Sequence, residues 1–178
     1  MYKFIRPILF LLQPERIHDI IINLLKIVNH IPFAGSIQRA LFNYQNPKLE
    51  REVFGIKFKN PVGLAAGFHK NGDSYNNLAN FGFGFIEIGS LTPKAQDGNP
   101  KPRCFRLPKD RAIINRMGIN NNGVKYAVEY IKNHKPNCVI GGNLSKNSNV
   151  SNEDAPKDYE KSFALLYDFV DYLEEVGM

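Results

Sequence analysis

The chain has 178 residues, of which 43% are hydrophobic and 22% are charged. This composition is typical of one globular domain, or of part of a larger one, and it excludes an intrinsically disordered chain. The net charge of +6 is mild, and no run of lysines or arginines resembles a nucleic-acid-binding patch, so we expect no nucleic-acid partner. Cys104 and Cys138 have no CxxC or metal-site spacing, which favours a reducing cytosolic compartment.

Residues 1–45 are predicted to form a small helical hairpin that is distinct from the rest of the chain. Pro14 stands where a first-turn proline is tolerated, and the apolar residues after it share one helical face: Ile17, Ile20, Ile21, Leu24 and Val28. The stretch before Pro14 is apolar around much of its circumference, and the segment as a whole is basic. Two interpretations remain open: a hairpin that lies in a membrane interface, and a helix pair docked on the main domain.

Neither a transmembrane helix nor a signal peptide is expected near the start. The longest clean apolar run there, residues 8–12, is far short of the ~20 residues that a span needs. Residues 13–16, Gln-Pro-Glu-Arg, follow at once, and no small-residue cleavage site appears.

Strands and helices alternate from residue 51 onward. Residues 54–58 look like a short strand or hairpin arm, and small or β-branched residues at 62–66 favour a strand covered on both faces. An irregular stretch is expected at about residues 92–121. Further strands are expected at residues 84–90 and 138–144, and helices at residues 74–81, 124–133 and 158–175. This order predicts a parallel βα design.

The carboxyl ends of parallel strands meet at one rim, where βα folds bind their ligands. The first predicted strand ends in a glycine-rich turn, in which Gly67 lets the backbone approach a flat ligand because no Cβ stands in the way. Lys70 is a lone cation in this turn and would stabilise a ligand that becomes anionic on reduction. The alternative is a tight strand-to-helix turn with a solvated lysine.

Hydroxyl and amide side chains supply the other candidates. Ser90 offers a hydroxyl at a second strand end, or a local cap, and Asn143 offers a paired donor and acceptor, or a turn residue. Residues 115–123 contain four asparagines and two glycines, which suits a planar substrate with ring carbonyls and N–H groups. The competing interpretation is a cap for the helix that starts near Val124.

The histidines indicate no metal site. His18, His30, His69 and His134 are scattered, and none pairs with a cysteine or a carboxylate at ligand spacing. The sequence also contains no GxGxxG or Walker pattern for a nucleotide.

Five ordered motifs together resemble the dihydroorotate dehydrogenase family, in its membrane-associated, quinone-using class. The motifs are residues 60–72, 86–93, 98–107, 114–121 and 142–147. The Pro-Glu-Arg-Ile-His run at residues 14–18 is similar to the extra N-terminal segment of that class. The resemblance covers nearly the whole chain, to about Tyr172.

The resemblance implies an α/β fold: the N-terminal part of a (β/α)8 TIM barrel, preceded by a small helical hairpin. Residues 1–45 would be the membrane- and quinone-associated segment, and residues 46–178 an incomplete FMN-binding barrel of about three βα units. It also implies oxidation of dihydroorotate to orotate in pyrimidine synthesis. FMN would accept the hydride, and a membrane quinone arriving through the helical segment would reoxidise it. The implied location is the cytoplasmic face of a membrane, as a peripheral protein.

By the resemblance, most of the candidate residues acquire roles. Those at the strand ends would contact FMN: Ala66, Gly67, Phe68, His69, Lys70, Ser90 and Asn143. Those that would hold dihydroorotate or orotate are Lys70, Asn115, Arg116, Met117, Gly118 and Ile119. Arg106 would face the quinone passage near the flavin.

The sequence departs from the family pattern at four places. His69 stands where the family more usually has aspartate, Ser145 replaces a usual glycine, and Ser90 replaces threonine but keeps the hydroxyl. After Tyr172 the family has a strand with an asparagine and the catalytic serine base, so we assign no catalytic base in this chain. We expect the 178-residue polypeptide to be inactive alone. It is then either an incomplete record of a working enzyme or a short product that binds membrane, quinone or a partner chain.

Overall fold

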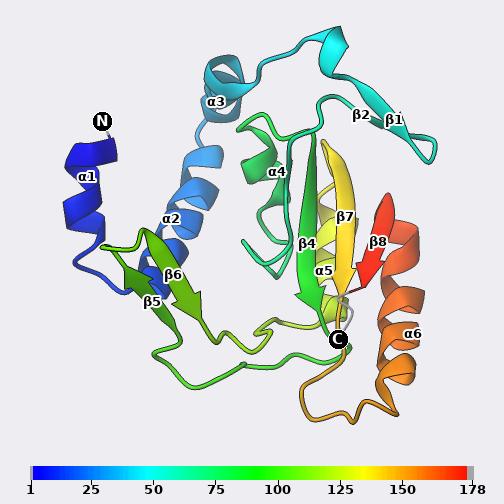
Figure 1. The fold of residues 1–178 in the computed structure, drawn as a ribbon. Coiled ribbons are helices and arrows are strands. Elements are labelled where there is room, and N and C mark those ends of the chain that lie inside the picture. The colour runs from blue at the N-terminus through cyan, green and yellow to red at the C-terminus, as the bar shows by residue number, and fades with distance from the viewer. Residues whose placement is uncertain (1, 176–178) are drawn as a thin grey trace.

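A computed structural model describes residues 2–175, with three helices at the start and a parallel sheet at the centre (Figure 1). The first helices are α1 (Tyr2–Leu9), α2 (Pro14–Asn29) and α3 (Ala34–Phe42). Pro14 occupies the first turn of α2, as expected. The chain bends by 114° between α2 and α3, so the predicted hairpin is a bent helix pair with a further helix before it.

Within residues 2–175 no single helix has the length and apolar character to cross a membrane. The bent pair α2–α3 reaches that threshold only when its two helices are taken together, by length and composition.

A short hairpin separates the helices from the sheet. After a single 3-10 turn at Pro47–Leu49, strands β1 (Arg51–Val53) and β2 (Ile56–Phe58) pair antiparallel, with Val53 opposite Ile56. The two residues between them, Phe54 and Gly55, both have positive φ, as a two-residue hairpin turn requires. The hairpin arm expected at residues 54–58 is therefore present.

The central sheet is parallel and has the order β3-β4-β7-β8. Its strands are β3 (Gly63–Leu64), β4 (Phe85–Leu91), β7 (Val139–Leu144) and β8 (Tyr172–Glu175). The connections between them contain α4 (Tyr75–Ala79), α5 (Val124–Asn133), α6 (Ala155–Leu166) and a 3-10 turn at Tyr167–Phe169. Strand–helix alternation in a parallel sheet confirms the predicted α/β design.

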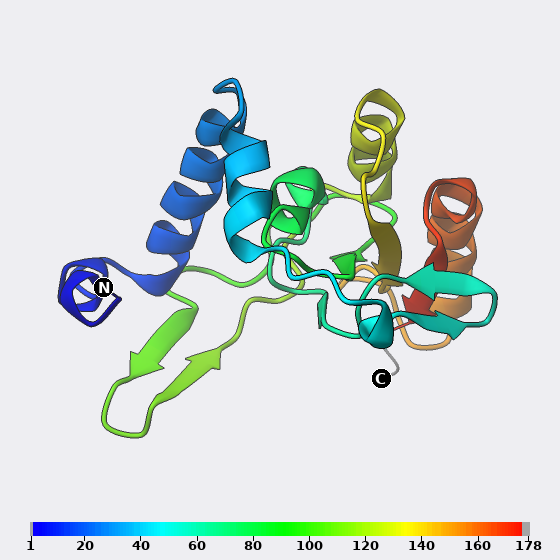
Figure 2. The ribbon, with the colours of Figure 1, turned by 90° about the horizontal axis from the view of Figure 1, so that it is seen from above.

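The hydrophobic core lies between the sheet and its helices. Figure 2 shows α5 and α6 along one side of the sheet, and Figure 1 shows the β1–β2 hairpin beyond the amino ends of the strands. The buried side chains between sheet and helices include Ile86, Ile88, Val124, Val128, Ile131, Ile140 and Leu166. On the opposite face Phe58 of β2 packs edge-on against Phe85, with ring centroids 5.3 Å apart. Strand β4 thus alternates between two environments, as the period of two requires.

The prediction of a helix at residues 158–175 is wrong for the last part of that range. Helix α6 ends at Leu166, and Tyr172–Glu175 is a fourth parallel strand instead of a helical turn. Asp171 anchors this strand, because its N–H donates to the Ile140 carbonyl (2.8 Å) and its carboxylate accepts from the Ile140 N–H (2.7 Å). Pairing with β7 therefore overrides the helical pattern of the local sequence.

Two further segments differ from the sequence prediction. Strand β3 is an edge strand of two residues, and Val62 beside it is 62% exposed, so it is not covered on both faces. The stretch expected to be irregular contains an antiparallel hairpin of β5 (Cys104–Leu107) and β6 (Ala112–Asn115). This hairpin extends beside α1 and α2 (Figures 1 and 2). Prolines around it had obscured the strand pattern, since proline is rare within strands.

Candidate active site at the strand ends

The glycine-rich turn after β3 is held against the end of β4. The Gly67 N–H donates to the Gly89 carbonyl (2.8 Å), and the Ala66 N–H donates to Glu87 Oε2 (3.2 Å). Gly67 has φ +94°, and a Cβ built on it would meet no atom within 4 Å. The turn therefore presents open backbone at the rim, where a flat ligand can approach closely.

Strands β4 and β7 approach each other closely at the same rim. A Cβ on Gly89 would lie 2.3 Å from the Asn143 carbonyl oxygen, so only glycine allows this contact. Asn143 is 5% exposed, its Nδ2 is 3.4 Å from Glu174 Oε2, and its Oδ1 has no hydrogen-bond partner within residues 2–175. A buried amide oxygen without a partner is costly, and a bound donor would satisfy it.

Lys70 lines a pocket of about 400 Å³. Burial lowers the pKa of its ammonium, and the Arg103 guanidinium lowers it further. No acceptor within residues 2–175 receives a hydrogen bond from Lys70, in contrast to Lys26 and Lys146. A half-buried cation without a partner fits the binding of an anionic or electron-accepting group.

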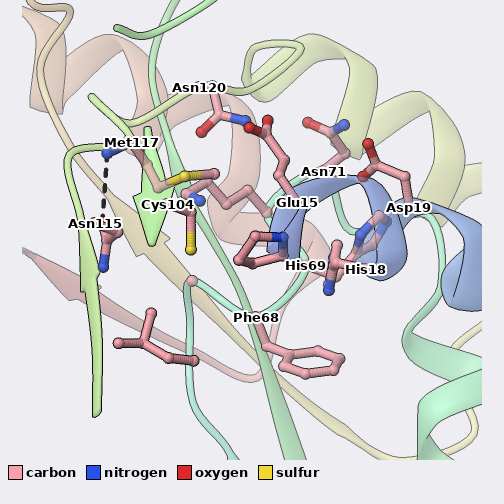
Figure 3. Close-up of a pocket in the computed structure, with 14 residues that line it drawn as sticks. Glu15, His18, Asp19, Phe68, His69, Asn71, Cys104, Asn115, Met117 and Asn120 are labelled. Atoms are coloured by element: carbon pink, nitrogen blue, oxygen red, sulfur yellow. Dashed lines mark hydrogen bonds between the residues drawn. The ribbon is translucent and has the colours of Figure 1, made fainter. Parts of the chain in front are cut away.

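The pocket joins three separate parts of the chain (Figure 3). The turn residues Gly67, Phe68, His69 and Lys70 form one wall. Asn115 and Met117 form another, where the Met117 N–H lies 3.4 Å from Asn115 Oδ1. Helix α2 forms the third, through Pro14, Glu15, His18 and Asp19.

The other candidate residues at the strand ends and in the loop do not line the pocket. Ser90 is half-buried in β4, and the Arg116 guanidinium donates to the Pro102 carbonyl (3.2 Å). The carbonyls of Gly118 and Ile119 accept from Gln96 Nε2 at 3.2 and 3.1 Å. These bonds hold residues 116–119 as an ordered loop behind Asn115 and Met117.

Arg106 lies at the junction of α1 and α2. Its Nη1 donates to the Leu12 carbonyl (2.6 Å), and its guanidinium carbon is 4.4 Å from the centroid of the Phe10 ring. The resemblance placed Arg106 beside a passage through the helical segment, and its contacts are with that segment.

The sequence analysis missed the contribution of α2 to the pocket. Arg103, which is 5% exposed, donates to Glu15 through Nη2 (2.6 Å) and Nε (3.2 Å), and Lys101 Nζ is 3.2 Å from the same carboxylate. The hydrogen bond from Arg103 is the main cause that lowers the pKa of Glu15. The resemblance of residues 14–18 to the family was the signal, but it assigned no role to these side chains.

Two histidines described as scattered are neighbours in space. The rings of His18 and His69 have centroids 5.9 Å apart, and His69 Nε2 forms a short contact with Asp73 Oδ1. Burial lowers the pKa of His18, and repulsion from His69 lowers it further. A pairing of α2 with the turn after β3 depends on the fold, so spacing along the chain does not reveal it.

The residues present fit a flavin ring. An isoalloxazine is flat and carries amide-like N–H and carbonyl groups, which match the open backbone at Gly67 and the unpartnered Asn143 Oδ1. Lys70 supplies a cation at the pocket that Gly67 also lines. The fit rests on the chemistry of these donors and acceptors.

The fold defines the chain as part of a parallel α/β barrel, with a candidate ligand site at the carboxyl ends of its strands. The family model described as dihydroorotate dehydrogenase matches residues 48–175, so the chain belongs to the dihydroorotate dehydrogenase family. This confirms the resemblance that the five motifs indicated.

Individual relatives agree with the family assignment. A dihydroorotate dehydrogenase (quinone) of Christiangramia forsetii is 54% identical over 97% of this chain and 51% of its own length. One from Coxiella burnetii is 48% identical over 97% of this chain and 48% of its own. The chain thus spans about half the length of the curated relatives it matches.

Solved structures support the fold. The ligand-free structure of an Eimeria tenella DHODH aligns with a TM-score of 0.77 at 37% identity, over 91% of this chain and 45% of that one. A complex of an Eimeria tenella DHODH with ferulenol aligns with a TM-score of 0.74 at 36% identity, over 91% and 43%. The expected fold class, the N-terminal part of a TIM barrel preceded by helices, is confirmed.

Proposed function

We propose that this chain forms the flavin- and substrate-binding half of a quinone-linked dihydroorotate dehydrogenase, which oxidises dihydroorotate to orotate. The observation that carries the proposal is the pocket that Lys70 lines together with Asn115 and Met117. This pocket brings together an amide side chain and a half-buried cation that donates no hydrogen bond within residues 2–175, and both suit a planar, anionic pyrimidine.

FMN is the proposed cofactor, and when bound it would supply the hydride acceptor. The open backbone of residues 66–69 would lie against the ring, the Ser90 hydroxyl would add a donor, and Asn143 Oδ1 would accept a hydrogen bond from a ring N–H. Lys70 would hold negative charge on the ring or on the substrate carboxylate, because its ammonium donates no hydrogen bond to an acceptor within residues 2–175. Residues 115–119 would orient the pyrimidine.

The helices α1–α3 are the proposed route for the quinone and the proposed contact with a membrane. Many apolar side chains of these helices and of the connections between them are exposed to solvent: Phe4, Ile8, Leu11, Leu24, Ile27, Ile31, Phe33, Ile37, Leu41 and Phe42. Such a surface favours a membrane interface for these helices, even though α2 also docks on the main domain through Glu15. We propose peripheral attachment, at the cytoplasmic face.

Flavin titration of the purified 178-residue chain tests this function. We expect saturable binding of one FMN with a changed visible spectrum, and a further change when orotate is added. Lys70→Met should raise the Kd for FMN by about tenfold, because the charge-assisted contact is lost. Lys125→Met, an exposed lysine on α5, is the matched control and should leave the Kd unchanged. Absence of any spectral change in the unaltered chain would contradict the proposal.

A second candidate function is a non-catalytic chain that binds a membrane or a partner protein. The observation that favours it is the open sheet: the described residues form four parallel strands, and a closed TIM barrel has eight. Strands β3 and β8 are edges with unpaired backbone groups, which are sites for pairing with other strands. Vesicle binding without FMN binding would support this function over the first.

A further inference from the structure

The carboxylate of Asp73 receives donors from three separate elements. Lys26 of α2 donates through Nζ to Oδ2 (2.7 Å), and the Tyr126 hydroxyl of α5 donates to the same oxygen (2.9 Å). His69, in the turn after β3, contacts Oδ1 through Nε2. Asp73 itself is 8% exposed, so a single buried carboxylate joins α2, the turn and α5.

This arrangement is that of a stable buried anion. Burial by itself would raise the pKa of Asp73, but the hydrogen bonds from His69 and Lys26 outweigh it and hold the pKa well below its usual range. A buried carboxylate needs such partners, and removal of one partner leaves the charge uncompensated. Lys26 is the only one of the three that lies on the N-terminal helices.

Two of the three elements that Asp73 joins, α2 and the turn after β3, also line the candidate pocket. His69 lines the pocket beside Lys70, and His18 lines it from α2. The two walls touch, since the His18 ring meets the Phe68 ring edge-on with centroids 5.1 Å apart. Lys26 lies about three helical turns beyond Glu15, whose bonds to Arg103 hold the other end of α2. Side-chain contacts therefore hold helix α2 at both ends, at Glu15 and at Lys26. Of the two, only the contact of Lys26 with Asp73, called the clamp below, also involves the turn of residues 66–70.

We propose that Asp73 is a positioning residue that fixes helix α2 against the turn of residues 66–70, and that it thereby couples ligand binding at the turn to the position of α2. The coupling rests on the proposed function, in which FMN binds this turn and a quinone enters along α2. The clamp itself rests only on the contacts of Asp73. Ordering of the turn by FMN would also order His69, and through Asp73 it would strengthen the hold on Lys26.

Hydrogen–deuterium exchange of the backbone amides of α2 tests the clamp without labels and without turnover. Lys26→Met removes the α2 contact from Asp73 and leaves His69 in place, so the exchange of α2 amides should accelerate by about fivefold. Asp73→Asn should accelerate it at least as much. Tyr126→Phe, which removes only the α5 contact, should leave α2 unchanged. The matched control is Lys157→Met in α6, which breaks an exposed ion pair with Asp154 at the start of that helix.

The same measurement with FMN present tests the coupling. In the unaltered chain, saturating FMN should slow the exchange of α2 amides, although Lys26 does not line the pocket. In Lys26→Met the protection of α2 by FMN should be lost, while protection of residues 66–70 remains. A merely structural role for Lys26 would change the baseline exchange but not the response to FMN.

Each outcome decides one part of the proposal. Unchanged α2 exchange in both Lys26→Met and Asp73→Asn would overturn the clamp. Accelerated exchange with an intact FMN response would overturn the coupling. If FMN produces neither spectral change nor protection of residues 66–70, the proposed function fails and the coupling with it, whereas the baseline exchange still decides the clamp. Lys26 is partly exposed, so Lys26→Met remains informative if Asp73→Asn fails to fold.

Discussion

Helices α2 and α5 are both amphipathic, yet they bury very different amounts of apolar surface. Helix α5 buries Val124, Ala127, Val128 and Ile131 against the sheet. Helix α2, although it is longer, buries only Ile22, and Leu24 and Ile27 on it are 55% and 64% exposed. The same sequence pattern therefore has two outcomes: α5 completes a core, whereas α2 docks by ion pairs at its ends and leaves apolar side chains exposed.

The largest effect is expected in the core around α5 and α6. Leu166 is fully buried and packs over Gly142, where even an added Cβ would lie 2.6 Å from the leucine side chain. Leu166→Ala should lower the free energy of unfolding by about 4 kcal/mol, because it leaves a cavity. Leu41→Ala on α3, where the side chain is 72% exposed, should change it by less than about 0.5 kcal/mol. Urea unfolding followed by circular dichroism measures both, and equal losses would contradict the contrast between core and helical segment.

The next largest effect is expected where α2 docks. Arg103→Met leaves the Glu15 carboxylate half-buried and without its main partner, so it should destabilise the docked state by about 3 kcal/mol. The loss should be local. Limited proteolysis should cut within residues 14–29 while the central sheet stays resistant. Arg51→Met, on the exposed β1 strand, is the control and should not alter the cleavage pattern. Uniform cleavage throughout the chain would show that α2 is part of the core instead.

A membrane interface for α1–α3 predicts a defined loss of lipid binding. Phe4 and Leu11 are each 83% exposed. Burial of each side chain in a membrane interface would contribute about 1.5–3 kcal/mol to the free energy of binding. The double variant Phe4→Ser, Leu11→Ser should therefore lower the partition coefficient on anionic lipid vesicles by about a hundredfold, with unchanged stability in urea. Vesicle flotation measures it. Phe54→Ser, which removes a fully exposed phenylalanine from the β1–β2 turn, is the control. Equal flotation of all three proteins would exclude a specific interface.

The smallest expected effect is the pH dependence of the α2 contacts. Hydrogen bonds lower the pKa values of Asp73 and Glu15 below their ordinary values of 3.8 and 4.5. Both groups therefore add stability above those ordinary values, and this stability is lost as the pH falls toward the folded-state pKa values, since the unfolded chain binds the protons first. Urea unfolding between about pH 5 and about pH 2.5 should show this loss. The pH dependence should be shallower in Glu15→Gln, and an unchanged slope would contradict it.

The sequence by itself predicted the elements whose patterns are local. The helix expected at residues 124–133 has those bounds, and the strand expected at 138–144 is present as Val139–Leu144. The five motifs resembled the dihydroorotate dehydrogenase family, and the family model over residues 48–175 confirms that resemblance. The prediction failed at residues 172–175, where the strand is decided by partners at Gly141 and Gly142 some thirty residues earlier.

For the candidate site, the sequence determined which residue types stand at the strand ends, and the tertiary structure decided which of them meet. Lys70 and Asn115 were both singled out in advance, but only the fold places them around one pocket. The wall formed by Glu15 and His18, and the joining of Lys26, His69 and Asp73, depend on how α2 docks. Periodicity and turn chemistry are properties of neighbouring residues, whereas these contacts span up to 88 residues and form only when the core has brought their elements together.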